Sequence, residues 1–139
     1  MSIKFGTDGW RAVIADTFTF ENLERVAQAT ADYWKRHRVK GTVGHIIVGY
    51  DRRFLSEEFA QRTAEVLAAN GFQVTLSDRP VPTPAVSWWV KASKAIGGVM
   101  ITASHNPPIF NGFKLKAHYG GSASTKLCQG VEALLGKTR

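Results

Sequence analysis

The stretch Ile96–Lys116, IGGVMITASHNPPIFNGFKLK, predicts a buried strand, a stiff polar loop and a second strand. Its apolar part, Val99–Ile101, follows two glycines and has the length of a strand inside a sheet. Pro107-Pro108 excludes a helix in the loop, because proline fixes its own φ and disfavours the helical conformation in the residue before it. In open α/β sheets, ligands bind at loops that leave the carboxyl ends of strands. This loop is therefore the first candidate for a functional site.

The loop and the strand after it carry reactive side chains: the hydroxyl of Ser104, the imidazole of His105 and the amine of Lys114. A serine nucleophile for acyl transfer is disfavoured. There is no G-x-S-x-G motif, and adjacent residues such as Ser104 and His105 tend to point their side chains apart. Residue chemistry alone leaves two interpretations of Ser104 open, a phosphoryl carrier and an ordinary loop residue.

Length and composition indicate one globular domain over residues 1–139, with 44% hydrophobic and 21% charged residues. No apolar run approaches the roughly 20 residues that cross a bilayer, and the N-terminus lacks the apolar core of a signal peptide. The single cysteine, Cys128, excludes an internal disulfide and fits a reducing compartment. We therefore expect a cytoplasmic protein that does not associate with membranes.

The charge is unevenly distributed. The net charge is +7, and the segment 79–131 contains no Asp or Glu. A basic segment without carboxylates suits an anionic partner and favours phosphate. Mg²⁺ needs oxygen ligands, and this segment has no carboxylate side chain to supply them. The basic residues are dispersed and form no nucleic-acid motif, so we disfavour nucleic acid as a partner. A solvated basic surface is the plain alternative.

The rest of the chain predicts alternating strands and helices. The turn at Asp8-Gly9 leads into a strand and places Arg11 close by, and a run at 45–50 predicts a strand buried on both faces. We predict N-caps at Thr19, Ser56 and Thr83 for three helices. Strand, helix and strand in this order form a right-handed βαβ unit.

The adjacent tryptophans Trp88 and Trp89 fall in the third predicted helix. Neighbouring helical positions cannot both face the same way, so one of the two could meet a partner surface. We favour core packing over that alternative. We interpret Lys116 as an ordinary surface charge.

Two motifs together resemble the phosphohexomutase family, which comprises phosphoglucomutase, phosphomannomutase and phosphoglucosamine mutase. They are TASHNPPIFNGFK at 102–114 and GTDGWR at 6–11. VGYDRR at 48–53 and PVPTP at 80–84 occur in the family's order, so the resemblance covers almost the whole chain. It implies a three-layer α/β/α domain with a central, mixed and roughly four-stranded sheet. The chain then corresponds to the family's domain I.

The resemblance also implies an activity. Ser104 would carry a phosphoryl group and pass it to a free hydroxyl of a hexose monophosphate. The hexose 1,6-bisphosphate that forms would turn round and return its other phosphoryl group, so that hexose 1-phosphate and hexose 6-phosphate interconvert. Such an enzyme is an isomerase of carbohydrate metabolism that acts by intramolecular phosphotransfer.

Residue roles follow from the same resemblance. Lys114 would contact phosphate and transfer a proton, and His105 would orient or stabilise the phosphoryl group. Arg11 would contact a substrate oxygen or phosphate, which its fixed fork of donors suits. Thr7 and Asn106 complete the substrate-binding and phosphate-binding set. A phosphoryl oxygen on Ser104 would be this chain's one ligand to Mg²⁺.

The chain departs from the family in what it lacks. Family enzymes have several domains, and the metal-binding aspartate loop, the sugar-reading loop and the C-terminal phosphate-binding domain have no match here. We therefore expect the remaining domains of a parent enzyme as partners, and an isolated chain that folds without turning over sugar phosphates. Two alternatives remain. The first is a non-catalytic module that binds phosphosugar or protein, or forms an oligomer, through surfaces that other domains normally cover. The second is a basic nucleic-acid-binding domain.

Overall fold

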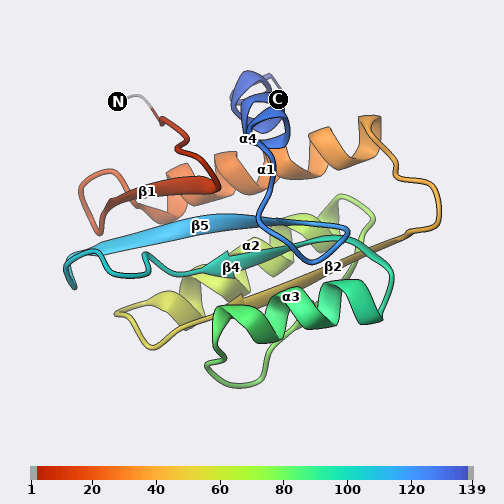
Figure 1. Cartoon of the computed structure of the whole chain (residues 1–139). Helices are drawn as coiled ribbons and strands as arrows, with labels where there is room; N and C mark the ends of the chain where they lie inside the picture. Colours follow the sequence, from red (N-terminus) through yellow and green to blue (C-terminus); the bar gives the residue numbers. More distant parts are fainter. Residues whose placement is uncertain (1–2, 138–139) are drawn as a thin grey trace.

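Five strands form one mixed sheet in the order β1-β5-β4-β2-β3 in this computed structural model, which describes residues 3–137 (Figure 1). Strand β2 pairs in parallel with β3 and β4, whereas β5 runs antiparallel to β4 and β1. The elements in chain order are β1 (Gly9–Val13), α1 (Phe20–Arg36), β2 (Val43–Tyr50), α2 (Ser56–Ala69), β3 (Gln73–Leu76), α3 (Thr83–Ala92), β4 (Ala95–Ile101), β5 (Phe110–Ala117) and α4 (Thr125–Ala133).

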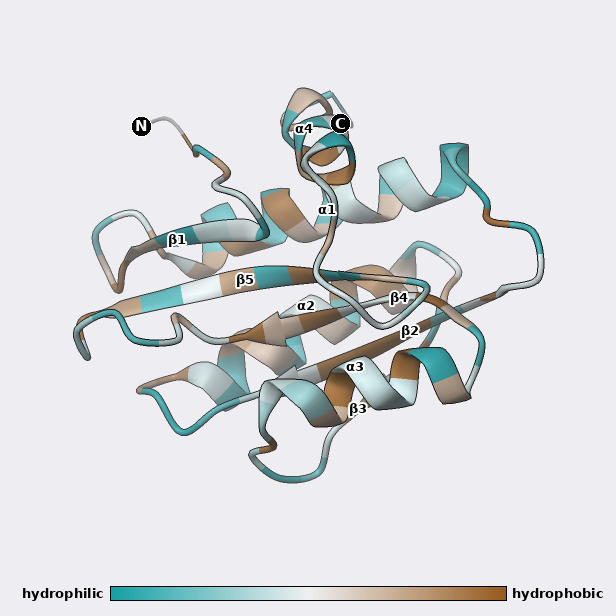
Figure 2. Cartoon of the chain, in the orientation of Figure 1, coloured by the Kyte–Doolittle hydropathy of each residue, from teal (hydrophilic) through white to brown (hydrophobic). Residues whose placement is uncertain are grey.

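Helices cover both faces of the sheet, which confirms the predicted α/β/α layers and the mixed sheet. Helices α1, α2 and α4 pack on one face, in the larger apolar cluster, and α3 packs on the other through Val86 and Val90. Neighbouring residues on β2 point to opposite faces, so Ile46 joins the larger cluster and Ile47 contacts the α3 side. Figure 2 shows β2 and β4 as largely hydrophobic, as expected for central strands buried on both faces.

The start of α1 agrees with the prediction. Thr19 is the N-cap, and its hydroxyl oxygen accepts a hydrogen bond from the Asn22 amide at 3.2 Å. Two other predicted caps are wrong, because Ser56 and Thr83 are the first helical residues. The caps are Leu55, with a left-handed φ of 63°, and Pro82. The sheet has five strands, against the roughly four that the resemblance implied, and β1, the strand predicted after the Asp8-Gly9 turn, lies at its edge next to β5.

Burial corrects two further predictions. Trp88 and Trp89 are exposed, at 72% and 41%, because the positions of α3 that face the sheet are Val86 and Val90. Lys116 is not a surface charge but is 5% exposed, on a strand that lies between two others in the sheet. Burial, followed by the nearby charge of Lys114, lowers the pKa of Lys116. No helix within residues 3–137 is long and apolar enough to cross a membrane.

Candidate functional site

The loop that contains Ser104 begins where two parallel neighbours, β2 and β4, end together. Tyr50 pairs with Ile101 in the register of these strands, so the next residues, Asp51 and Thr102, lie side by side. The Thr102 hydroxyl donates to Asp51 Oδ2 at 2.6 Å, and the Asp51 amide donates to the Ile101 carbonyl at 3.1 Å. The Ser104 loop is therefore fastened at its first residue to the turn between β2 and α2.

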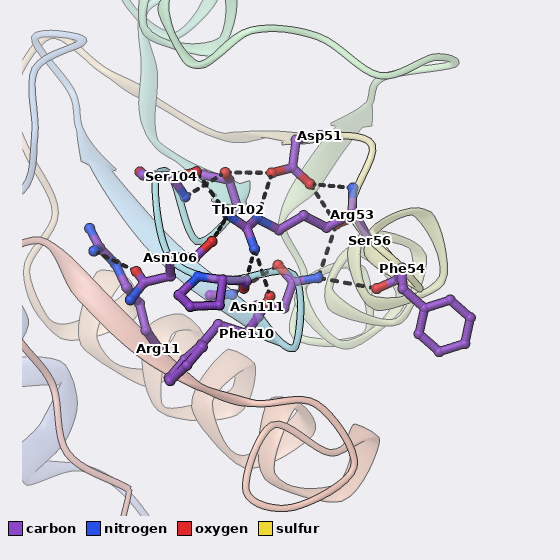
Figure 3. Close-up of polar contacts among 12 residues, drawn as sticks. Arg11, Asp51, Arg53, Phe54, Ser56, Thr102, Ser104, Asn106, Phe110 and Asn111 are labelled. Carbon is purple, nitrogen blue, oxygen red and sulfur yellow. Dashed lines mark hydrogen bonds and ion pairs between the residues drawn. The ribbon is translucent and has the colours of Figure 1, made fainter.

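Behind the loop, the guanidinium of Arg53 donates four hydrogen bonds to backbone carbonyls (Figure 3). Its Nη2 reaches the carbonyls of Ser104 at 2.8 Å and Asn106 at 2.7 Å. Its Nη1 reaches the carbonyls of Pro107 at 2.8 Å and Phe110 at 3.1 Å. Each bond to a charged donor stabilises by about 1.5–3 kcal/mol before cooperative effects, so these contacts fix the loop's path.

The carboxylate of Asp51 is the counter-ion of this guanidinium and a hub for neighbouring donors. It accepts from the Thr102 and Ser56 hydroxyls and from the Arg53 amide, and the Arg53 Nε lies 3.5 Å from Oδ2. The Ser56 hydroxyl also accepts from Asn111 Nδ2 at 3.0 Å. Ser56 therefore connects Asp51 to the start of β5 instead of capping α2.

Ser104 itself adopts a left-handed backbone conformation, with φ at 53°. A non-glycine residue there costs on the order of 1 kcal/mol, and such strain persists where surrounding contacts fix it. Its amide donates to the Thr102 hydroxyl oxygen at 3.1 Å, while its side chain is exposed and has no hydrogen-bond partner within residues 3–137. The backbone is held and the hydroxyl is left free for chemistry.

In front of the loop lies an open hollow of about 560 Å³. Arg11 donates to Asn106 Oδ1 at 3.0 Å and lies 3.7 Å from the carboxylate of Asp8. Lys114 lies 3.5 Å from the other oxygen of Asp8. Two cations share one carboxylate, so the local balance stays positive and suits a phosphate. The hollow is lined by Arg11, Ser104, His105, Asn106, Pro107 and Lys114.

Five of the six residues predicted for the site thus lie around one hollow, and Thr7 does not. Thr7 lines a neighbouring hollow of about 340 Å³ together with Lys4 and Gly6, and that hollow shares Arg11 with the first. His105 is exposed and makes no polar contact within the described part of the chain. The side chain of Asn106 is occupied with Arg11. The chemical roles of all six residues stay predictions.

Sequence reasoning missed the pair that organises the loop, Asp51 and Arg53. A signal was present, because both follow directly after a buried strand, at the sheet edge where the Ser104 loop also starts. It could have been found by placing β2 next to β4, since the carboxyl ends of parallel neighbours meet.

The described residues do not by themselves form a magnesium site. Within residues 3–137, no group of three or more His, Cys, Asp or Glu side chains could hold a metal ion. The carboxylates of Asp8 and Asp51 are both engaged, Asp8 with Arg11 and Lys114 and Asp51 with the Ser56 and Thr102 hydroxyls. A Mg²⁺ ion at Ser104 would need carboxylate ligands from outside this chain.

Fold and site together define an α/β domain that presents an exposed serine, on a fixed loop beside two cations, at the carboxyl edge of its sheet. Residues 2–139 match the family model "Phosphoglucomutase/phosphomannomutase, alpha/beta/alpha domain I". The chain therefore belongs to the phosphoglucomutase/phosphomannomutase family, as the sequence resemblance predicted.

Relatives support the same membership. The chain is 42% identical over 126 residues to a phosphoglucomutase from Staphylococcus epidermidis, covering 89% of the chain and 23% of that protein. It is 37% identical to a phosphoglucosamine mutase from Rippkaea orientalis, covering 92% and 26%. A crystal structure from Thermus thermophilus, provisionally named a phosphomannomutase, superposes with a TM-score of 0.90 at 43% identity, covering 97% of this chain and 30% of that one. The chain thus spans about a quarter of its relatives' length.

Proposed function

We propose that residues 1–139 form the phosphoserine-bearing domain of a phosphohexomutase, in which Ser104 carries the phosphoryl group. In the forward step, the bond between Ser104 Oγ and phosphorus breaks while a sugar hydroxyl forms a new bond to phosphorus and loses its proton. The reverse step from the other end of the hexose 1,6-bisphosphate restores phosphoserine. Hexose 1-phosphate and hexose 6-phosphate thereby interconvert.

The observation that carries the proposal is the free hydroxyl of Ser104 on a backbone held from behind, beside the cations of Arg11 and Lys114. Phosphoryl transfer depends mainly on positioning and on stabilising charge. Phosphoserine adds about −1.5 to −2 charges, which the hollow's positive balance would stabilise. An ordinary loop serine would not need a strained φ and two cations that share one carboxylate.

The other residues of the hollow have roles in the proposal that their positions support. Arg11 is held by Asn106 and Asp8 and directs its remaining donors at a phosphate or a sugar oxygen. Lys114 contacts the phosphoryl group and exchanges the proton of the attacking hydroxyl, which it can accept only in its neutral form. His105 orients the phosphoryl group, and Thr7 contacts the far end of the substrate from the adjoining hollow.

The test reconstitutes the missing part. This chain is mixed with a separately produced polypeptide that contains the remaining domains of the Thermus thermophilus relative. Turnover of glucose 1-phosphate is followed with a trace of glucose 1,6-bisphosphate and Mg²⁺. We expect turnover only with both polypeptides, and none with Ser104→Ala. Ser122→Ala, a serine in the turn after β5, serves as the matched control and should keep full activity. Mutase turnover that survives Ser104→Ala would refute the proposal.

Intact mass measurement separates two reasons for a silent assay. Incubation with glucose 1,6-bisphosphate should add one phosphoryl group to the reconstituted wild type and to Ser122→Ala, but not to Ser104→Ala. If the two polypeptides bind each other without phosphorylating Ser104, Ser104 is not the carrier. If they fail to bind, a single fused polypeptide of the same composition repeats the test.

A second candidate, a protein-binding module, is favoured by one observation, the exposure of Trp88 and Trp89 on α3. Neighbouring exposed tryptophans often mark a contact surface. Sedimentation of the isolated chain at increasing concentration tests self-association. A shift towards dimer that Trp88→Ser removes would support the module, and a monomer at all concentrations would count against it.

A further inference from the structure

Arg53 is not among the residues that line the hollow, yet its guanidinium donates to four backbone carbonyls of the Ser104 loop. The peptide groups on both sides of Ser104 depend on the same ion pair. The carbonyl of Ser104 accepts from Arg53, and the amide of Ser104 donates to Thr102, whose hydroxyl in turn donates to Asp51. Figure 3 shows this cluster, with Arg53 between Asp51 and the loop.

We propose that Arg53 is a positioning residue that holds Ser104 in its left-handed conformation and thereby aims the Ser104 hydroxyl into the hollow. Its catalytic consequence rests on the proposed function, but the effect on the loop does not. The conformation at φ 53° is not one that serine adopts readily, so an outside constraint is needed. Arg53 is that constraint, because it binds the carbonyls of residues before and after both prolines of the loop.

The geometry requires arginine specifically. Nη1 and Nη2 each donate twice, and Nε faces the Asp51 carboxylate, so the planar fork serves the loop on one edge and its counter-ion on the other. A lysine at this position could keep the positive charge, but its single ammonium group could not span four carbonyls. Charge and geometry can therefore be separated by Arg53→Lys.

The chain offers a matched control one residue away. Arg52 has the same side chain on the same turn, is exposed, and makes no hydrogen bond or ion pair with any residue in the range 3–137. If a change in net charge alone affected the loop, Arg52→Gln and Arg53→Gln would act alike. If the contacts matter, Arg53→Gln and Arg53→Lys should act alike and Arg52→Gln should resemble the wild type.

The first measurement is amide hydrogen exchange in the isolated chain. The amides of Ser104, Asn106 and Phe110 are hydrogen-bonded within the loop. In Arg53→Lys we expect these three amides to exchange at least about 10-fold faster, while sheet amides such as that of Ile47 keep their rates. Arg52→Gln should change neither set. If Arg53→Gln does not fold, Arg53→Lys alone decides. Wild-type protection of the loop in a folded Arg53→Lys variant would overturn the proposal.

The second measurement is turnover in the reconstituted enzyme. A small displacement of the Ser104 hydroxyl lowers the rate of phosphoryl transfer, while the residues that bind the substrate stay in place. We therefore expect kcat of Arg53→Lys to fall about 100-fold, with KM within about threefold of the wild type. An unchanged kcat despite faster loop exchange would mean that Arg53 is only a structural residue and would reject its positioning role. Activity that persists in Ser104→Ala would instead reject the proposed function and leave the exchange result standing.

Discussion

The two sides of the Ser104 loop use the same kind of charge for different purposes. Behind the loop, Arg53 is largely covered, and its donor groups contact four backbone carbonyls and the Asp51 carboxylate. In front, Arg11 and Lys114 share the single carboxylate of Asp8 at 3.7 and 3.5 Å and face an open hollow. The rear cation sets the position of the loop, and the front cations remain available for a ligand.

This difference shows why counting basic residues does not identify a phosphate site. Cations on both sides count toward the net charge of +7, but only the front has donors left over for an anion. A cation whose donors all bond to protein carbonyls stabilises the structure. A cation that shares one carboxylate with a second cation keeps donors that can bind an anionic substrate. Substitutions on the two sides should therefore separate activity from stability.

The largest expected effect is on the front side. Lys114→Gln should lower phosphoryl transfer in the reconstituted enzyme by about 100-fold or more, because it removes both a charge at the phosphoryl group and the proton carrier. The free energy of unfolding should fall by only about 1–2 kcal/mol, because Asp8 keeps Arg11 as a partner when its ion pair with Lys114 is removed. Turnover and urea denaturation measure the two quantities.

Lys114→Arg is the control for that substitution. It keeps the charge and the contact with Asp8 but cannot supply a neutral base, because arginine stays protonated. Partial activity would show how much of the effect is charge stabilisation. Full activity in Lys114→Gln would place the proton transfer elsewhere, and the front would then differ from the rear only in exposure.

Gly112 joins the two sides and should show the largest effect on stability. A Cβ at this position would lie 2.4 Å from the Thr102 carbonyl oxygen behind and 3.0 Å from Arg11 Cγ in front. Gly112→Ala must therefore push β5 away from the start of the loop, and we expect a loss of about 3 kcal/mol in urea denaturation. Gly6→Ala, where a Cβ would make only an ordinary contact at 3.7 Å, should change stability little. Equal effects of the two substitutions would show that the loop and β5 are not tightly coupled.

The front side was predictable from the sequence and the rear was not, for a physical reason. Ser104, His105, Asn106 and Lys114 are close in sequence, so one loop and one turn bring them together. Arg11 is 95 residues from Asn106, and its place in the site was predicted through the family resemblance. Arg53 reaches the loop from a different element, across a separation of 51 residues to Ser104. The parallel pairing of β2 with β4 brings the two segments together. Which strands pair cannot be predicted from the sequence pattern of a single strand.

The fold shows the same limit. Helix and strand periods predicted most of the elements, because these periods depend on side-chain spacing along one element, and the family resemblance predicted their arrangement in layers. The two missed caps and the exposed tryptophans depend on contacts between elements. The Ser56 hydroxyl donates to Asp51 instead of capping the N-terminus of α2. Helix α3 points Val86 and Val90 inward because the sheet lies on that side.

Cys128 on α4 packs against the turn that carries Asp8, so it reports on how closely α4 and this turn are packed. Its thiol lies 3.7 Å from the carbonyl of Thr7, beneath the turn that carries Asp8. Burial, then the charges of Asp8 and Glu132, raise the pKa of Cys128 to about 11. An unfolded thiol ionises first, from its ordinary value of 9.0, so the unfolded state gains stability as the pH rises from 9.0 to about 11.

Between about pH 8 and about pH 10.5 the wild type should therefore lose about 1–2 kcal/mol more unfolding free energy than Cys128→Ala does. Comparing pH values within each variant removes the cost of the cavity and the contribution of Lys116, which both chains share. Parallel curves for the two variants would show that the thiol ionises freely in the folded chain and that the turn above it is open.

The smallest expected effect falls on the residue between the two sides. Ser104→Gly removes the Cβ that makes φ 53° unfavourable. It keeps the hydrogen bond from the residue-104 amide to Thr102 and the hydrogen bond from Arg53 to the residue-104 carbonyl. We expect the variant to be more stable than Ser104→Ala by about 1 kcal/mol in urea denaturation, although neither can carry a phosphoryl group. Combining each substitution with Arg53→Lys sharpens the comparison. If Arg53 imposes the strain, the advantage of glycine over alanine should shrink once the loop is released. An advantage that stays constant would mean that the left-handed turn is intrinsic to the loop, with the contacts behind it adding nothing to the conformation of Ser104.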